Sequence, residues 1–135
     1  MNSRVLYWIV TVVAAAFMVM TAVPDVLRIP QAIAVIVHLG YPPYLLLFLG
    51  IAKILGAIVI LTPGLQRLKE WAFAGLAFDV TGALYSHLSV GDPPSVWMPA
   101  VIALTLLTGA YLSYRRSVRL PDRADVLTHA DAARA

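Results

Sequence analysis

The segment YLLLFLGIAKILGAIVILTPG, residues 44–64, is apolar almost from end to end, yet it carries a lysine, Lys53, near its middle. A helix of roughly 20 apolar residues spans the hydrocarbon core of a bilayer, and this segment has that length. An ammonium group at such a depth costs about 2.5–3.5 kcal/mol on insertion scales, so it usually faces inward and has a partner. The fold and the candidate site therefore both depend on what surrounds Lys53.

The composition favours lipid as the solvent of this chain. Its 135 residues are 61% apolar and 13% charged, with a mean hydropathy of +0.83, whereas soluble domains carry roughly 25% charged residues. The absence of cysteine excludes disulfides, thiolate metal sites and dithiol chemistry. The net charge of +3 comes from arginines in loops and in the tail, which indicates loops that orient a membrane protein and no nucleic-acid partner.

Four segments have the length and apolarity of membrane helices, and clusters of proline and glycine separate them. They comprise residues 5–23, the opening segment, residues 71–90 and residues 97–114. The first is too long for a cleaved signal peptide and lacks an A-x-A site before a soluble body. We therefore predict an all-α integral membrane four-helix bundle over residues 1–116 and a polar cytoplasmic tail over residues 117–135.

A fifth apolar stretch, QAIAVIVHLGY at residues 31–41, is too short to cross a bilayer. As a helix it would cover only about 16 Å. We expect an interfacial or re-entrant helix on the outer side, between the first two spans. It would be either a lid over the mouth of the bundle or a simple connection.

Charges in the loops agree on one orientation. Basic residues flank the ends that would face one side of the membrane, and the opposite side carries Asp25, Arg28 and Asp92. By the positive-inside rule, the chain is a multi-pass protein of the bacterial cell (inner) membrane with both termini cytoplasmic. The basic residues that set this orientation are Arg4, Arg67, Lys69, Arg115, Arg116 and Arg119.

Asp79 is the predicted partner of Lys53. Each lies eight residues from the inner end of its segment, so both sit about 12 Å from the cytoplasmic edge if the two segments are adjacent and antiparallel. Small residues accompany both charges on their helix faces, and such residues let membrane helices approach closely. On one helix these are Gly50, Gly56 and Ala57, and on the other Gly75, Gly82, Ala83 and Ser86.

Other polar residues extend this candidate site. His87 lies two turns beyond Asp79 near the outer mouth, level with Tyr44, while Glu70 begins its segment as either a helix cap or an inner polar site. Two histidines and an aspartate at these spacings do not make a zinc motif, so we predict no metal. The candidate catalytic residues are Asp79, Lys53 and His87, and the candidate ligand-binding residues are Lys53, Asp79, Ser86, His87, Tyr44 and Glu70.

The central motifs, LGYP, LG..K.LGA followed by L.P, LKEWA.AG and SH...GD, cover residues 39–92. Together they resemble the signature of the DoxX-like family of small bacterial membrane proteins, with similar hydropathy over residues 5–114. The resemblance implies a four-helix membrane bundle. Its relatives include a subunit associated with thiosulfate:quinone oxidoreduction and others suspected of partnering redox enzymes. Where the family often has a glycine and a lysine at the end of the first span, this chain has MTAVPDVL, residues 20–27.

Three functions remain open on this evidence. The bundle could bind a small lipophilic molecule, a quinone being the cofactor that the resemblance allows, as an accessory to a membrane or peripheral oxidoreductase. It could instead be a membrane-embedded enzyme in which Asp79, Lys53 and His87 perform acid/base chemistry, such as isomerisation, epoxide opening or hydrolysis, on a lipophilic substrate. In the third case the Lys53–Asp79 pair only sets helix register, and the small-residue faces form a homodimer.

Overall fold

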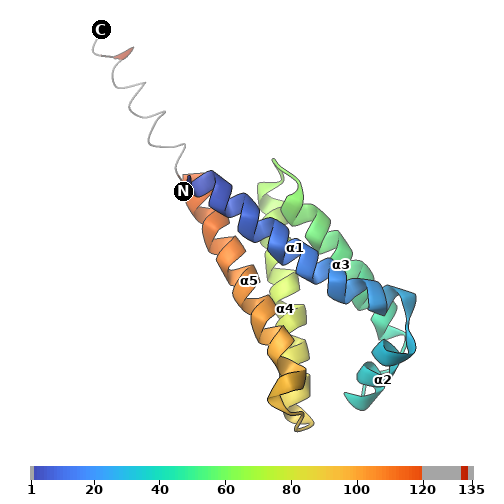
Figure 1. Ribbon diagram of the computed structural model, residues 1–135. Coiled ribbons are helices and arrows are strands. Elements are labelled where there is room, and N and C mark those ends of the chain that lie inside the picture. The colour runs from blue at the N-terminus through green and yellow to red at the C-terminus, as the bar shows by residue number, and fades with distance from the viewer. Residues whose placement is uncertain (1, 120–131, 134–135) are drawn as a thin grey trace.

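The computed structural model describes residues 2–119 and 132–133, and over this part of the chain the regular structure consists of five α-helices (Figure 1). The all-α prediction is therefore confirmed. The tail predicted at residues 117–135 lies mostly outside the described residues. The helices are α1 (Ser3–Leu27), α2 (Pro30–His38), α3 (Leu45–Leu61), α4 (Gln66–Ser89) and α5 (Pro94–Arg119).

The four long helices pack around one core. α1 contacts α3 and α5, while α4 contacts the same two helices from the other side, so α3 and α4 are adjacent as predicted. One face of α1 is buried, including Thr11, Ala15, Met18 and Ala22. The core also includes Tyr7, Ala57, Ile60, Phe73, Leu76, Val80, Ala103, Leu107, Ala110 and Tyr114.

The chain reverses at glycines between the long helices. The N-terminus, the turn between α3 and α4, and the last turn of α5 lie at one end of the molecule (Figure 1). α2 and the turn between α4 and α5 lie at the other end. Gly64 and Gly91, in the turns on either side of α4, have positive φ angles of 84° and 78°, a conformation that costs glycine little.

One expected helix end is wrong. The first helix does not stop at Pro24 but runs through it to Leu27, and Arg28 then ends it in a left-handed conformation with φ 51°. Proline lacks a backbone N–H and so removes one hydrogen bond of the helix, but here the helix continues for three more residues beyond it. The consequence is that Asp25, expected in an outer loop, belongs to the last turn of α1.

By length and composition, two helices are candidates to cross a membrane: α1 and residues Pro94–Val118 of α5. α3 is strongly apolar but has 17 residues. α4 has 24 residues, and its first turns carry Arg67, Lys69 and Glu70. The short fifth segment is helical as expected, over nine residues from Pro30 to His38.

Of the four glycines expected at helix contacts, two lie against a neighbouring helix. A Cβ on Gly50 would lie 2.7 Å from Val26 Cγ2 of α1, and a Cβ on Gly56 would lie 2.9 Å from the Leu76 side chain of α4. A Cβ on Gly75 or Gly82 would meet nothing within 4 Å among the described residues, so these two glycines face open space. α3 is therefore the helix that packs closely, first against α1 and then against α4.

Candidate functional site

A cavity of about 710 Å³ lies between the helices toward the end that carries α2. Its walls are mostly apolar and come from α1 to α5, with Phe17, Met18, Leu46, Leu49, Phe78 and Ala103 among them. Polar groups occur in two places along the walls. One is an ion cluster around Lys53, and the other is a set of hydrogen bonds near His87.

The ion cluster consists of one ammonium group and two carboxylates. Lys53 Nζ donates a hydrogen bond of 2.8 Å to Asp25 Oδ2 and lies 3.8 Å from Asp79 Oδ2. All three side chains are largely buried, with 15–18% of their surface exposed. The structure thus brings Lys53 and Asp79 together, but the closer partner is Asp25, which sequence reasoning assigned to a loop.

The close approach of α1 and α3 explains why Asp25 reaches Lys53. Gly50 lets the α3 backbone pack against Ala22 and Val26 of α1, and Lys53 follows Gly50 by about one helical turn. Asp25 lies between those two α1 residues in the sequence, in the last turn of the helix. Lys53 therefore stands between the two helices that α3 touches most closely, with one carboxylate from each.

The C-terminal ends of α2 and α4 position the residues that form the hydrogen bonds near His87. After α2, Gly40 takes a positive φ of 85°, and Tyr41 N–H bonds back to Ile36 O at 3.0 Å. After α4, Gly91 takes a positive φ and Asp92 N–H bonds back to His87 O at 3.0 Å. This six-residue closure after a left-handed glycine is the Schellman motif. It accounts for the spacing in LGYP and SH...GD, because each glycine turns the following residue back over its own helix.

Tyr41 then joins α4 through a directed chain of hydrogen bonds. Ser86 Oγ donates to Gly82 O at 2.8 Å, so its single proton is already used. The 2.9 Å contact between Tyr41 Oη and Ser86 Oγ must therefore have the tyrosine as donor. Ser86, one of the predicted site residues, is buried and lines the cavity.

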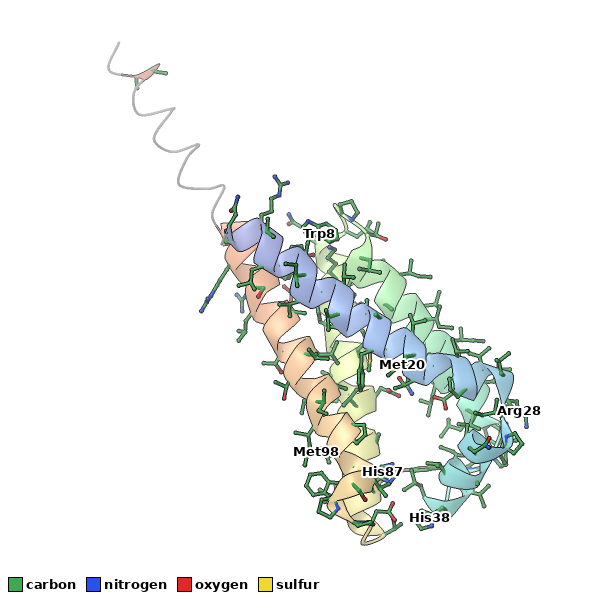
Figure 2. All side chains as sticks on the ribbon, in the orientation of Figure 1. Trp8, Met20, Arg28, His38, His87 and Met98 are labelled. Atoms are coloured by element: carbon green, nitrogen blue, oxygen red, sulfur yellow. The ribbon has the colours of Figure 1, made fainter. Side chains whose placement is uncertain are left out.

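Asp92 links two histidines at the end of the molecule that carries α2. Its Oδ2 accepts from His87 Nδ1 at 2.6 Å, and its Oδ1 accepts from His38 Nε2 at 2.7 Å. Figure 2 shows His38 at the end of α2 and His87 on α4 near one another at this end of the molecule. The hydrogen bonds from His87 and His38 hold the pKa of the Asp92 carboxyl below its usual range.

Two predicted site residues lie elsewhere. The side chain of Tyr44 is 73% exposed and does not line the cavity, whereas Tyr41, three residues earlier, does. Glu70 is exposed near the opposite end of α4. Sequence reasoning missed the roles of Asp25, Asp92 and Tyr41, although the glycine that precedes each of the last two was a usable signal.

The site offers hydrogen-bond donors and acceptors to a ligand. Within the part of the chain that the structure describes, no group of three or more His, Cys, Asp and Glu side chains is arranged to hold a metal ion. The Lys53 ammonium is a donor, the Tyr41 hydroxyl, whose proton goes to Ser86, is an acceptor, and the Asp25 and Asp79 carboxylates are acceptors at the buried end. Such convergent polar groups in an apolar cavity are typical of small-molecule sites.

An all-helical chain with two helices apolar enough to cross a bilayer, and a buried ion cluster in an apolar cavity, has the features of a small membrane protein. The sequence profile of the DoxX-like family matches residues 9–109, well over half of the chain. The chain belongs to the DoxX-like family, as its motifs predicted. No curated protein and no solved structure matches it.

Proposed function

We propose that this chain is a four-pass protein of the cell (inner) membrane with both termini cytoplasmic. The long helices have 17 to 26 residues and are about 26 to 39 Å long, against a hydrocarbon core of about 30 Å. Large apolar side chains are exposed on the outer faces of all four, which suits lipid and not water. They include Ile9 and Val12, Phe48 and Leu55, Trp71 and Leu88, and Ile102 and Leu112.

Within this membrane domain, the protein binds a small lipophilic ligand of the quinone class in the cavity beside Lys53. The observation that carries this proposal is the apolar cavity of about 710 Å³ with an ammonium group and two carboxylates on its wall. Ligand sites usually have 300–1,000 Å³ and a few convergent polar groups. A quinone has two carbonyl oxygens that accept hydrogen bonds, and Lys53 on the cavity wall has N–H groups beyond the one that it donates to Asp25.

In this proposal the protein is an accessory to a redox system. The chain has no cysteine for thiol chemistry, so electrons would pass between the bound quinone and a partner oxidoreductase. The role of the chain is to hold the ring of the ligand in an apolar environment. Hydrogen bonds of Tyr41 and His38 link the α2 end of the cavity to α4 and the turn after it, so a ligand that enters at this end has to pass or break these links.

A second function is favoured by one specific feature, the pair of carboxylates that share Lys53. An ammonium group beside two carboxylates can donate a proton in one position and accept one in another, which general acid/base catalysis requires. An enzyme of this kind would isomerise, hydrolyse or open an epoxide in a lipophilic substrate. In that case Asp79, farther from the ammonium than Asp25, is the better candidate for proton transfer, because it has no hydrogen bond to another described side chain.

Extraction in mild detergent followed by mass spectrometry of the bound small molecules tests the first proposal, with a short-chain quinone added as the probe. We expect quinone binding that Lys53→Met and Asp79→Asn weaken at least tenfold, while Glu70→Gln, the same acid-to-amide change outside the cavity, leaves it intact. Absence of binding, or equal loss in Glu70→Gln, overturns it. Conversion of a candidate epoxide or alkene substrate that Asp79→Asn abolishes would instead support the enzyme.

A further inference from the structure

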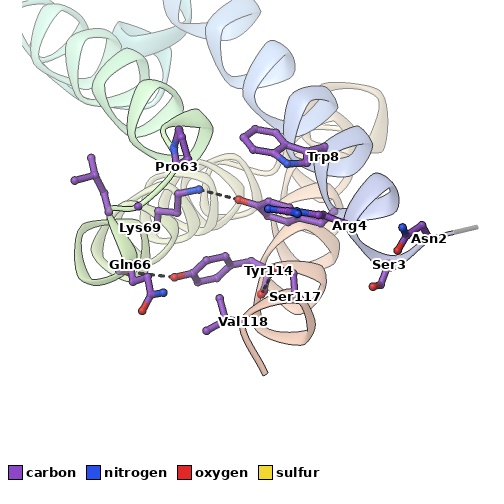
Figure 3. Close-up of a pocket in the computed structure, with 13 residues that line it drawn as sticks. Asn2, Ser3, Arg4, Trp8, Pro63, Gln66, Lys69, Tyr114, Ser117 and Val118 are labelled. Atoms are coloured by element: carbon purple, nitrogen blue, oxygen red, sulfur yellow. Dashed lines mark hydrogen bonds between the residues drawn. The ribbon is translucent and has the colours of Figure 1, made fainter. Parts of the chain in front are cut away.

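A second cavity, of about 560 Å³, lies at the end of the molecule opposite α2. Its walls come from the first turns of α1, the turn between α3 and α4, the first turn of α4 and the last turns of α5 (Figure 3). In the proposed topology this end faces the cytoplasm, at the level of the lipid headgroups. Lys69, which the sequence analysis counted among the basic residues of the loops, lines this cavity from the first turns of α4.

Lys69 is buried, with 4% of its surface exposed. Its Nζ donates a 2.8 Å hydrogen bond to Tyr7 Oη and lies 5.5 to 5.7 Å from the ring centres of Tyr7, Trp8 and Tyr114. Aromatic faces stabilise a cation but do not use its N–H groups as a carboxylate does. An ammonium has three N–H donors, and the tyrosine oxygen accepts one of them.

No counter-ion accompanies this buried charge in the part of the chain that the structure describes. None of the carboxylates of residues 2–119 and 132–133 lies within 4 Å of Lys69 Nζ, and the exposed Glu70 does not line the cavity. Buried lysines are normally paired, because desolvating an unpaired charge is costly. Lys53, the other lysine of this chain, has two carboxylate partners, so the two buried lysines differ in this respect.

The surroundings of Lys69 add positive potential. Arg4 lines the same cavity. α4 begins at Gln66 with no side-chain cap and no acidic residue in its first turn, so the positive end of its dipole is not neutralised there. A lysine in the first turns of a helix is unfavourable for the same electrostatic reason. These features together make a site that an anion would stabilise.

We propose that this cavity binds a phosphate group, either in the headgroup of an anionic lipid or as free phosphate. A phosphate presents several acceptor oxygens, which suit the two remaining N–H donors of Lys69 and the guanidinium of Arg4. A volume of about 560 Å³ holds a headgroup together with its phosphate. The site is separate from the ion cluster at Lys53 and shares no lining residue with that cavity.

The lysine content of the chain makes a direct test practical. Lys53 and Lys69 are its two lysines, so a full-length protein labelled with 13Cε-lysine gives two lysine signals in detergent micelles. The spectrum of Lys53→Met contains only the Lys69 signal, so it assigns both lysine signals. The probes are short-chain phosphatidylglycerol, short-chain phosphatidylcholine as a zwitterionic control, and inorganic phosphate.

We expect phosphatidylglycerol to shift the Lys69 signal with saturation and to leave the Lys53 signal in place. Saturation by phosphatidylglycerol alone identifies a lipid headgroup as the ligand, whereas saturation by inorganic phosphate as well identifies a free-phosphate site. A Lys69 signal that responds to none of these probes, or that shifts equally with phosphatidylcholine, overturns the proposal. A quinone titration of the same sample reports on Lys53, so the failure of either proposal is visible without the other.

Variants supply the second measurement. Lys69→Met should weaken phosphatidylglycerol binding at least tenfold, and Arg4→Gln, at the exposed rim, about threefold. The matched control is Arg67→Met, which removes an exposed cation two residues earlier and should change binding less than twofold. Equal losses in Arg67→Met and Arg4→Gln would indicate attraction to general surface charge and refute the site, even if Lys69→Met did not fold.

Discussion

The ion cluster around Lys53 predicts unequal effects when its two carboxylates are removed. At an effective dielectric constant of about 20, separations of 2.8 and 3.8 Å correspond to attractions of about 6 and about 4 kcal/mol, before the opposing desolvation. The nearer partner, Asp25, also accepts the hydrogen bond. We therefore expect Asp25→Asn to lower the free energy of unfolding by about 1–2 kcal/mol more than Asp79→Asn does.

Removal of the cation is the stronger perturbation. Lys53→Met leaves two largely buried carboxylates of like charge without a partner, and breaking a buried ion pair from one side typically costs about 3–5 kcal/mol. Replacing all three side chains together, in Lys53→Met/Asp25→Leu/Asp79→Leu, removes every charge and should restore most of that loss. The triple variant thus separates the cost of an unpaired charge from the value of the cluster itself.

Equilibrium unfolding in mixed detergent micelles measures these differences. Glu70→Gln is the matched control, because it makes the same acid-to-amide change on an exposed side chain and should alter stability by less than about 0.5 kcal/mol. The reasoning fails if Asp79→Asn costs as much as Asp25→Asn. It also fails if Lys53→Met is as stable as the unmodified protein.

Three further predictions concern packing, a buried hydroxyl and pH. Gly50→Ala should destabilise the protein by about 1–3 kcal/mol in the same assay, because the new Cβ would clash with α1, whereas Gly75→Ala, where a Cβ meets nothing within 4 Å, should be neutral or stabilising. Thr11→Val should raise stability by about 1 kcal/mol, since the buried Thr11 hydroxyl has no hydrogen-bond partner among the described residues; a loss of stability would contradict this. The depressed pKa of Asp92 means that its contribution to stability is present above about pH 4 and is lost as the pH falls from that value through the lower pKa of the folded state. Asp92→Asn should therefore flatten the dependence of Tm on pH below about pH 5, and an unchanged profile would show that the histidine contacts do not matter.

Much of the fold followed from helix geometry applied to the sequence. The turn between α3 and α4 is short, so counting residues from it placed Lys53 and Asp79 at the same depth, and the structure brings them to 3.8 Å. The short helix between the first two long helices was also predicted from an apolar stretch with prolines at both sides. These features depend on the number of residues in each segment and on the rise per residue of a helix, so they can be worked out from the sequence alone.

Other features depended on how helices cross, which local patterns do not contain. Pro24 was taken as the end of the first helix, so Asp25 was assigned to a loop, and no count of depth could then bring it to Lys53. The glycines of α4 were expected at helix contacts, but Gly75 and Gly82 face open space. A glycine in a sequence shows that a close approach is allowed, and only the packing decides whether one occurs.

Lys69 shows a similar limit in the use of charge. The positive-inside rule counts a basic residue near a helix end without regard to its burial, and by that count Lys69 was one of six equivalent cations. The structure separates it from the others by burying it among aromatic rings. Tyr7 and Trp8 lie on α1 and Tyr114 lies on α5, and nothing local in the sequence brings them together.

The second carboxylate at Lys53 bears on whether the cluster has a function beyond holding the helices. A pair that only fixed the register of α3 against its neighbours would need one carboxylate, and Asp25 already supplies it with a direct hydrogen bond. Asp79 adds a negative charge that is largely buried and lies 1 Å farther from the ammonium, which is costly for a scaffold. That excess charge lies on the wall of a cavity of ligand size and not inside a packed core. A carboxylate kept at this cost in this position is better explained by a ligand or a proton that it receives than by helix packing.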